Sequence, residues 1–199
     1  DPANWSGTEG LPNRLGEHLW YSAVAMVIAA LIGLPLGVLT GHARKGGALV
    51  IGLGNAARAL PTLGLLTLMV FLVGLGLMAP LVALVAIAVP PILVNTYQAV
   101  RQVPDDVVNA ARWLGMTPAQ VVFSVEIPAA LSLILVGVRT AAIQVVATAT
   151  VAAYVGLGGL GRYIFDGLSV RDYQLVAVGA VLSAIAAVGA EAIFVGFER

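Results

Sequence analysis

The sequence has no cysteine, only two histidines and little charge. Without cysteine, the chain can form neither disulfides nor thiolate metal sites, and thiol catalysis is excluded. His18 and His42 lie in separate polar segments, so no metal site is predicted. The 10 basic and 10 acidic residues cancel, and no run of lysine or arginine provides a stripe for phosphates. Nucleic acid is therefore not an expected partner.

Charged residues make up 10% of the chain, whereas about a quarter of an ordinary soluble domain is charged. Hydrophobic residues make up 60% of the 199 residues. Since a membrane-spanning helix needs about 20 apolar residues, the chain can cross a bilayer about five times. We predict an all-α integral membrane domain at residues 20–199, preceded by a polar extracytoplasmic tail at residues 1–19. The apolar runs cover residues 20–41, 49–74, 77–97, 127–154 and 174–197.

Small residues and prolines mark two of these runs. Gly33, Gly37 and Gly41 form two overlapping GxxxG spacings in the first run. They either let a neighbouring helix approach closely or reflect chance in a glycine-rich chain. Arg58 and Pro61 interrupt the second run, so we expect a kink or a break there.

Basic residues in the short loops predict the orientation. Residues 42–45 (His-Ala-Arg-Lys) join the first two runs, while Arg101 and Arg112 lie between the third and fourth. The positive-inside rule places both loops in the cytoplasm, with the N-terminus outside and the C-terminus inside. Arg162 and Arg171, in the opposite loop, weaken this asymmetry.

The polar stretch at residues 98–126 predicts two short helices. Asp105 or Asp106 can cap the first helix, and Gly115 can end it in a left-handed conformation. Helical spacing places four apolar residues on one face of this first helix: Val107, Val108, Ala111 and Leu114.

The second short helix has a clear start signal. Thr117 as the N-cap, with Pro118 at the first helical position and Gln120 three residues after the cap, predicts a capping box. Pro128 marks the boundary to the next span. The helix-glycine-helix unit, with Trp113 exposed, is either a docking element for another protein or a compact connector on the membrane surface.

The same stretch resembles a known motif. Residues 109–111 (Asn-Ala-Ala), Gly115 and residues 125–128 (Val-Glu-Ile-Pro) have the spacing of the EAA motif of binding-protein-dependent ABC importer permeases. In that family the motif forms a coupling helix that sits in a cleft on the ATPase subunit. Asn109 stands where the family usually has Glu. Asparagine keeps a polar group at this position but removes the charge. The resemblance implies ATPase coupling by Asn109, Ala110, Ala111, Trp113, Gly115, Thr117 and Pro118.

The likeness covers nearly all residues from about residue 20 onward. Four further segments look like the osmoprotectant subfamily, which imports glycine betaine, choline, carnitine or proline betaine: residues 58–63, 90–97, 137–141 and 156–161. The resemblance implies a permease in the bacterial cell membrane, surrounded by lipid. Its expected partners are ABC ATPase subunits, a second permease subunit and an extracytoplasmic solute-binding protein. The exact solute, and whether the second permease is identical, stay open.

The chain lacks the residues for ATP hydrolysis. A phosphate-binding loop needs a lysine after glycine, but Arg44 precedes Lys45, the single lysine. We therefore predict no catalytic residue and no cofactor here, with ATP and Mg²⁺ in a partner chain. Gly156, Gly158 and Gly161 match GxGxxG, but they follow a predicted membrane helix and not a strand. We interpret them as a turn at the outer mouth.

Candidates for the pathway or its gates come from residues that are unusual in membrane helices. Arg58 and Arg139 lie inside apolar runs, where they either line the pathway or bond to carbonyls freed near Pro61 or Pro91. Tyr97 and Tyr154 are candidates because aromatic rings attract quaternary ammonium groups. Anchoring at the membrane interface is the alternative role for each of them. The full set is Arg58, Pro61, Pro90, Pro91, Asn95, Tyr97, Arg139, Tyr154, Gly158 and Gly159.

Two other classes of protein compete with an importer subunit. A self-contained channel or ion-coupled transporter predicts inverted repeats and paired intramembrane acids, and the sequence displays neither. A membrane scaffold would use the capped loop only for binding. A membrane enzyme is the weakest reading, because no catalytic pair lies at a suitable spacing within a span.

Overall fold

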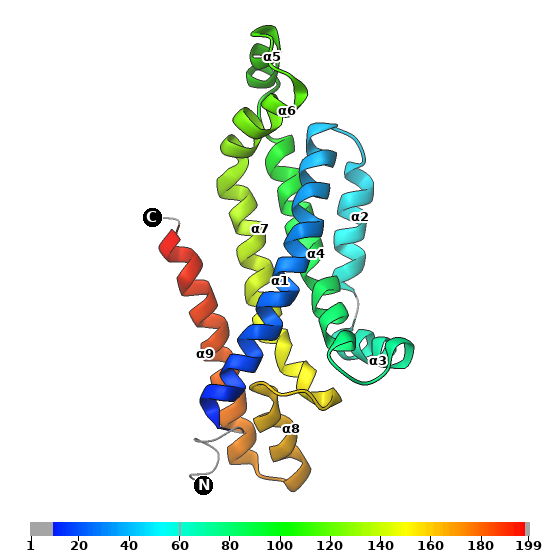
Figure 1. The fold of residues 1–199 in the computed structure, drawn as a ribbon, viewed down its shortest axis with the longest axis vertical. Coiled ribbons are helices and arrows are strands. Elements are labelled where there is room, and N and C mark those ends of the chain that lie inside the picture. Colours follow the sequence, from blue (N-terminus) through cyan, green and yellow to red (C-terminus); the bar gives the residue numbers. More distant parts are fainter. Residues whose placement is uncertain (1–9, 60, 198–199) are drawn as a thin grey trace. The chain divides into compact units, whose positions relative to one another are not determined.

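The structure is a computed structural model that describes residues 10–59 and 61–197, and these residues contain helices and no strand. This confirms the predicted all-α membrane class. The elements run in the following order (Figure 1): α1 (Leu11–His42), α2 (Gly47–Arg58), α3 (Thr62–Val73), α4 (Met78–Arg101), α5 (Asp105–Trp113), α6 (Pro118–Val121), the π-helical η2 (Val122–Glu126), α7 (Ile127–Thr148), the 3₁₀-helical η3 (Ala149–Val155), α8 (Gly161–Val170) and α9 (Tyr173–Phe197).

Four of the described helical stretches are long and apolar enough to cross a membrane: α1, α4, α9 and the stretch at residues 118–155. The pair α2 and α3 raises the number to 5 if it counts as one broken span. The predicted break is present, because α2 ends at Arg58 and α3 begins at Thr62. Pro61 precedes α3 in an extended conformation, with φ −69° and ψ 120°. Proline has a fixed φ and no N–H, so it starts a helix more readily than it continues one.

The first helix is longer than the sequence predicted. It begins at Leu11, so residues 11–19 of the expected polar tail are helical, whereas residues 1–9 lie outside the described residues. Arg14, His18 and Ser22 recur every four residues and are all buried. This polar face packs against protein, which explains why hydropathy placed the start of the helix too late.

The described residues divide into two compact units. Unit 2 comprises Ala29–Ala59 and Val89–Ala141, and unit 1 comprises the other described residues. Unit 2 therefore holds α2, α5, α6 and η2 together with parts of α1, α4 and α7.

Close backbone packing joins α1 to α4 in unit 2. A Cβ atom on Gly37 would lie 2.6 Å from Thr96 Cβ, and Cβ atoms on Gly33 and Gly41 would lie 2.9 and 2.8 Å from side chains of the same helix. This geometry favours the interpretation of the GxxxG spacings as a packing face over chance. A buried apolar cluster then connects α4 through α7 and includes Val100 and Val108.

In unit 1, α8 packs on α9 through a glycine. A Cβ atom on Gly179 would lie 2.8 Å from Tyr163 Cβ. Burial raises the pKa of the Tyr163 phenol above its ordinary value, and the charge of Arg14 acts in the opposite direction. Tyr163 is thus a packing residue between α8 and α9.

Candidate functional site

The helix pair α5–α6 lies beyond the ends of α4 and α7 in unit 2 (Figure 1). Its first helix begins differently from the prediction. Pro104, and neither Asp105 nor Asp106, is the N-cap, and no side chain caps this helix. The extended conformation of Pro104 is sufficient to start the helix, and both aspartates fall in its first turn. Their charges there favour the positive end of the helix dipole.

The turn between the two helices is as predicted. Gly115 has φ +86°, in the left-handed region. Its N–H donates to the Arg112 carbonyl over 2.9 Å, and the Met116 N–H donates to the Ala111 carbonyl over 3.2 Å. These two bonds form a Schellman motif, which satisfies carbonyls at the end of α5. The angle between α5 and α6 is thus set by hydrogen bonds.

The capping box of α6 is confirmed. The Gln120 N–H donates to Thr117 Oγ1 over 3.4 Å, and the Thr117 N–H donates to Gln120 Oε1 over 2.8 Å. Pro118 occupies the start of the helix, where the missing N–H costs nothing.

The next span, α7, begins at Ile127, beside the predicted boundary at Pro128, but the helix does not break there. The chain continues from α6 through η2 into α7, and residues 118–155 form one helical stretch. Within η2 the Ile127 N–H donates to the Val122 carbonyl, a five-residue step. A proline cannot donate the usual bond and its ring clashes with the carbonyl four residues earlier. The wider π turn accommodates both defects, so the helix passes through the proline.

The predicted apolar face of α5 is only partly buried. Val108 and Ala111 are buried, whereas Val107 is 46% exposed and Leu114 is 84% exposed. The buried side is rotated toward Val108, which joins the cluster between α4 and α7. Trp113 is 87% exposed, as expected.

Six of the seven residues predicted to couple to an ATPase are exposed, and Ala111 alone is buried. Ala111 belongs to the buried cluster that packs α5 against α4 and α7, and the other six lie exposed between residues 109 and 118. We call this surface the tip: Asn109, Ala110, Trp113, Gly115, Thr117 and Pro118.

Sequence reasoning missed the contacts that the turn between α1 and α2 makes with this helix pair. His42 Nδ1 lies 2.6 Å from Glu126 Oε2, and the Glu126 side chain is 2% exposed. Arg44 forms an ion pair with Asp105, and its Nη2 donates to the Val103 carbonyl over 3.2 Å. The partners are far apart in sequence, so only the basic character of the turn was visible beforehand.

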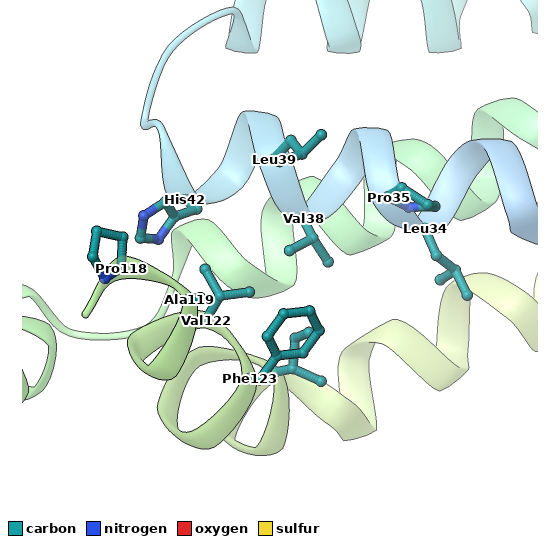
Figure 2. Close-up of a pocket in the computed structure, with 10 residues that line it drawn as sticks. Leu34, Pro35, Val38, Leu39, His42, Pro118, Ala119, Val122 and Phe123 are labelled. Atoms are coloured by element: carbon teal, nitrogen blue, oxygen red, sulfur yellow. The ribbon is translucent and has the colours of Figure 1, made fainter. Parts of the chain in front are cut away.

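An apolar groove of about 550 Å³ lies beside these contacts in unit 2. Figure 2 shows side chains of α1 on one side and of α6 and η2 on the other. All lining residues except His42 are apolar: Leu34, Pro35, Val38, Leu39, His42, Pro118, Ala119, Val122, Phe123 and Ile127.

Six pathway candidates lie in unit 2: Arg58, Pro90, Pro91, Asn95, Tyr97 and Arg139. The five other than Arg58 are half-buried. Asn95 Nδ2 donates to the Pro91 carbonyl over 2.7 Å, and a Cβ atom on Gly137 would lie 2.6 Å from Asn95 Cβ. Asn95 therefore lies where α7 meets α4. Arg58 ends α2, but its side chain lies outside the described residues.

Four more candidates lie in unit 1: Pro61, Tyr154, Gly158 and Gly159. Tyr154 and Phe165 form an aromatic pair, with ring centroids 5.5 Å apart. The Gly159 N–H donates to Glu17 Oε2 over 2.8 Å, and a Cβ atom on Gly158 would overlap the same carboxylate. The glycine turn is therefore closely packed against the Glu17 side chain.

Membrane-length apolar helices, with an exposed helix pair joined by a hydrogen-bonded turn and inserted between two of them, define a membrane transport subunit of the ABC importer permease fold. The profile of the family described as binding-protein-dependent transport system inner membrane component matches residues 33–199, and the chain belongs to this family. Membership implies a membrane location and a transport system with further subunits, including a binding protein.

Several relatives align over most of the chain. The choline transport system permease protein OpuBB of Bacillus subtilis is 37% identical, covering 92% of this chain and 84% of that protein. The glycine betaine/carnitine/choline transport system permease protein OpuCB of the same organism is also 37% identical, over 94% of this chain and 86% of that protein. The osmoprotectant import permease protein OsmW of Salmonella typhimurium is 33% identical, over 86% of this chain and 82% of that protein.

Solved structures agree with the fold. An inward-facing structure of the MetNI methionine ABC transporter matches with a TM-score of 0.74 and 25% identity, covering 95% of this chain and 96% of that chain. A second crystal form of that transporter has a TM-score of 0.77 and 24% identity, over 100% of this chain and 99% of that chain. The predicted ABC importer permease fold is thus confirmed.

Proposed function

We propose that this chain is the translocation subunit of an ATP-driven importer for osmoprotectants that carry a quaternary ammonium group, such as choline, glycine betaine or carnitine. The names of the similar permeases support this substrate class. The observation that carries the mechanism is the exposed tip on a helix pair whose connecting turn is fixed by a Schellman motif and a capping box. Such a unit can transmit force, because its internal angle is set by hydrogen bonds.

The partner chain is an ABC ATPase that receives the tip. Trp113 and Leu114 offer apolar surface for a cleft on that subunit, and Asn109 offers a polar group. Closure of the ATPase pair moves α5 and α6, and the covalent connections to α4 and α7 carry the movement into the membrane. The result is alternating access, with ATP and Mg²⁺ bound by the partner.

A second permease subunit completes the pathway, since about five helices enclose too little space for a solute path on their own. We place the N-terminus outside and the C-terminus in the cytoplasm, following the basic residues of the loops. The bond between Glu17 and Gly159 then lies near the outer face, where the external binding protein delivers its solute.

Selection of the solute belongs mainly to the binding protein. A quaternary ammonium group has no N–H to donate, so aromatic faces are its natural contacts. Tyr97 in unit 2 and the Tyr154–Phe165 pair in unit 1 are the candidates in this chain. They do not form a cage within either unit, which suits a path of low selectivity.

Reconstitution tests the proposal directly. The chain is placed in vesicles with its candidate ATPase and binding protein, and uptake of labelled choline, glycine betaine and carnitine is measured with and without ATP. We expect uptake only in the complete system with ATP. Transport by the purified chain alone would instead support a self-contained channel or secondary transporter.

A further inference from the structure

We propose that His42, the last residue of α1, and Arg44, in the turn between α1 and α2, form a clasp that links the coupling helix pair to α1. His42 and Arg44 are positioning residues in this clasp, and the inference rests on the proposed function. The covalent chain connects the helix pair to α4 and α7 only. The clasp adds a direct connection to a third membrane helix.

The contact at the end of η2 is the buried half of the clasp. Glu126 is the last residue of η2 and is 1% exposed. Its Oε2 lies 2.6 Å from Nδ1 of His42, the last residue of α1, which is 84 positions away in sequence. A buried carboxylate that loses its partner is strongly destabilised. Glu126 therefore keeps the end of α1 beside η2.

The contact at the start of α5 is the exposed half of the clasp. Arg44 pairs with Asp105, the first residue of α5, and also donates to the Val103 carbonyl. Arg44 has φ +53°, in the left-handed region that residues other than glycine rarely adopt. This backbone conformation is maintained at a cost, and the two bonds of the guanidinium group offset it.

The two contacts hold opposite ends of the segment formed by α5, α6 and η2. Asp105 begins this segment and Glu126 ends it, yet their partners, Arg44 and His42, are almost adjacent in sequence. Below the turn, a Cβ atom on Gly41 would lie 2.8 Å from Val100 Cβ, so α1 is also in close contact with α4. Movement of the helix pair is therefore delivered to α1 and α4 together.

A charge swap in the reconstituted importer tests the exposed half. We expect Arg44→Asp and Asp105→Arg each to lower solute-stimulated ATP hydrolysis and solute transported per ATP by about fivefold or more, within the usual range of coupling between sites. The double variant should restore most of both. Aspartate tolerates a positive φ, so the swap does not strain the turn. Lys45→Asp is the matched control, because Lys45 is exposed and adjacent, and it should behave as wild type.

A double-mutant cycle tests the buried half. His42→Gln and Glu126→Gln should each lower transport per ATP, and the double variant should be no worse than either single variant, since both remove the same contact. Size-exclusion chromatography checks that each complex assembles. Single variants that match Lys45→Asp, or an Arg44–Asp105 swap that restores nothing, would overturn the clasp. If the wild-type importer itself shows no solute-stimulated hydrolysis, the proposed function fails instead.

Discussion

Gly115 shows how much a single residue contributes at the smallest scale. Its φ of +86° is one that a β-branched side chain resists strongly. We expect Gly115→Val to insert into the membrane normally but to lose solute-stimulated ATP hydrolysis in the assembled importer. Gly115→Asn should retain much of it, because asparagine tolerates the left-handed region. Equal hydrolysis in the two variants would show that the turn does not transmit movement.

Two glycines near the η3–α8 connection allow a sharper comparison. A Cβ atom on Gly158 would meet only the mobile end of Glu17, whereas one on Gly161 would meet the Thr150 backbone carbonyl. We expect Gly158→Ala to cost about 1 kcal/mol, the value of one hydrogen bond. Gly161→Ala should cost more, about 1–3 kcal/mol, because backbone must move. Thermal unfolding in detergent ranks the stabilities of the two variants. Gly16→Ala is the control, since nothing lies within 4 Å of a Cβ atom at that position.

Residues whose role is set by near neighbours were predictable. The capping box and the turn at Gly115 depend on contacts within a few positions, and both are present. The aspartate cap was wrong because a proline nearby starts the helix without a side-chain bond. The contact between His42 and Glu126 joins positions 84 apart, so no local pattern could reveal it.

At the scale of elements, the packing of α1 on α4 makes the clearest prediction. A Cβ atom on Gly37 would lie 2.6 Å from Thr96 Cβ, and Thr96 is fully buried. We expect Gly37→Val to destabilise the protein by about 1–3 kcal/mol, as overpacking does. Gly52→Val is the control, since a Cβ atom there meets nothing within 4 Å. Equal melting temperatures for the two variants would contradict the close contact.

The elements themselves were largely predictable from apolar runs, because lipid requires about 20 such residues for each span. The interruption near Pro61 was visible because Arg58 and Pro61 stand inside one of these apolar runs. The early start of α1 was not predictable, because Arg14 and His18 are polar, as loop residues usually are, yet they are buried against other parts of the protein. The continuous helix from α6 into α7 was not predicted, because the π turn that accommodates Pro128 has no signature in composition.

For the whole molecule, metal dependence separates this chain from its partners. The described residues contain no group of three or more side chains suited to hold a metal ion. We expect a chelator to stop uptake by the complete importer, because Mg²⁺ serves the ATPase. The melting temperature of the purified permease should not change. A lower melting temperature with chelator would indicate a metal site in the permease itself.

The contact between α1 and α4 also limits which displacements are open to unit 2. Gly33, Gly37 and Gly41 follow one another at intervals of four residues, each opposite a branched side chain of α4. Sliding α1 along α4 brings the next glycine into register only after about 6 Å, four residues at 1.5 Å each. Shorter slips would set larger side chains of α1 against those branched groups. The two helices therefore either move together as one rigid body or shift along each other in steps of one glycine interval.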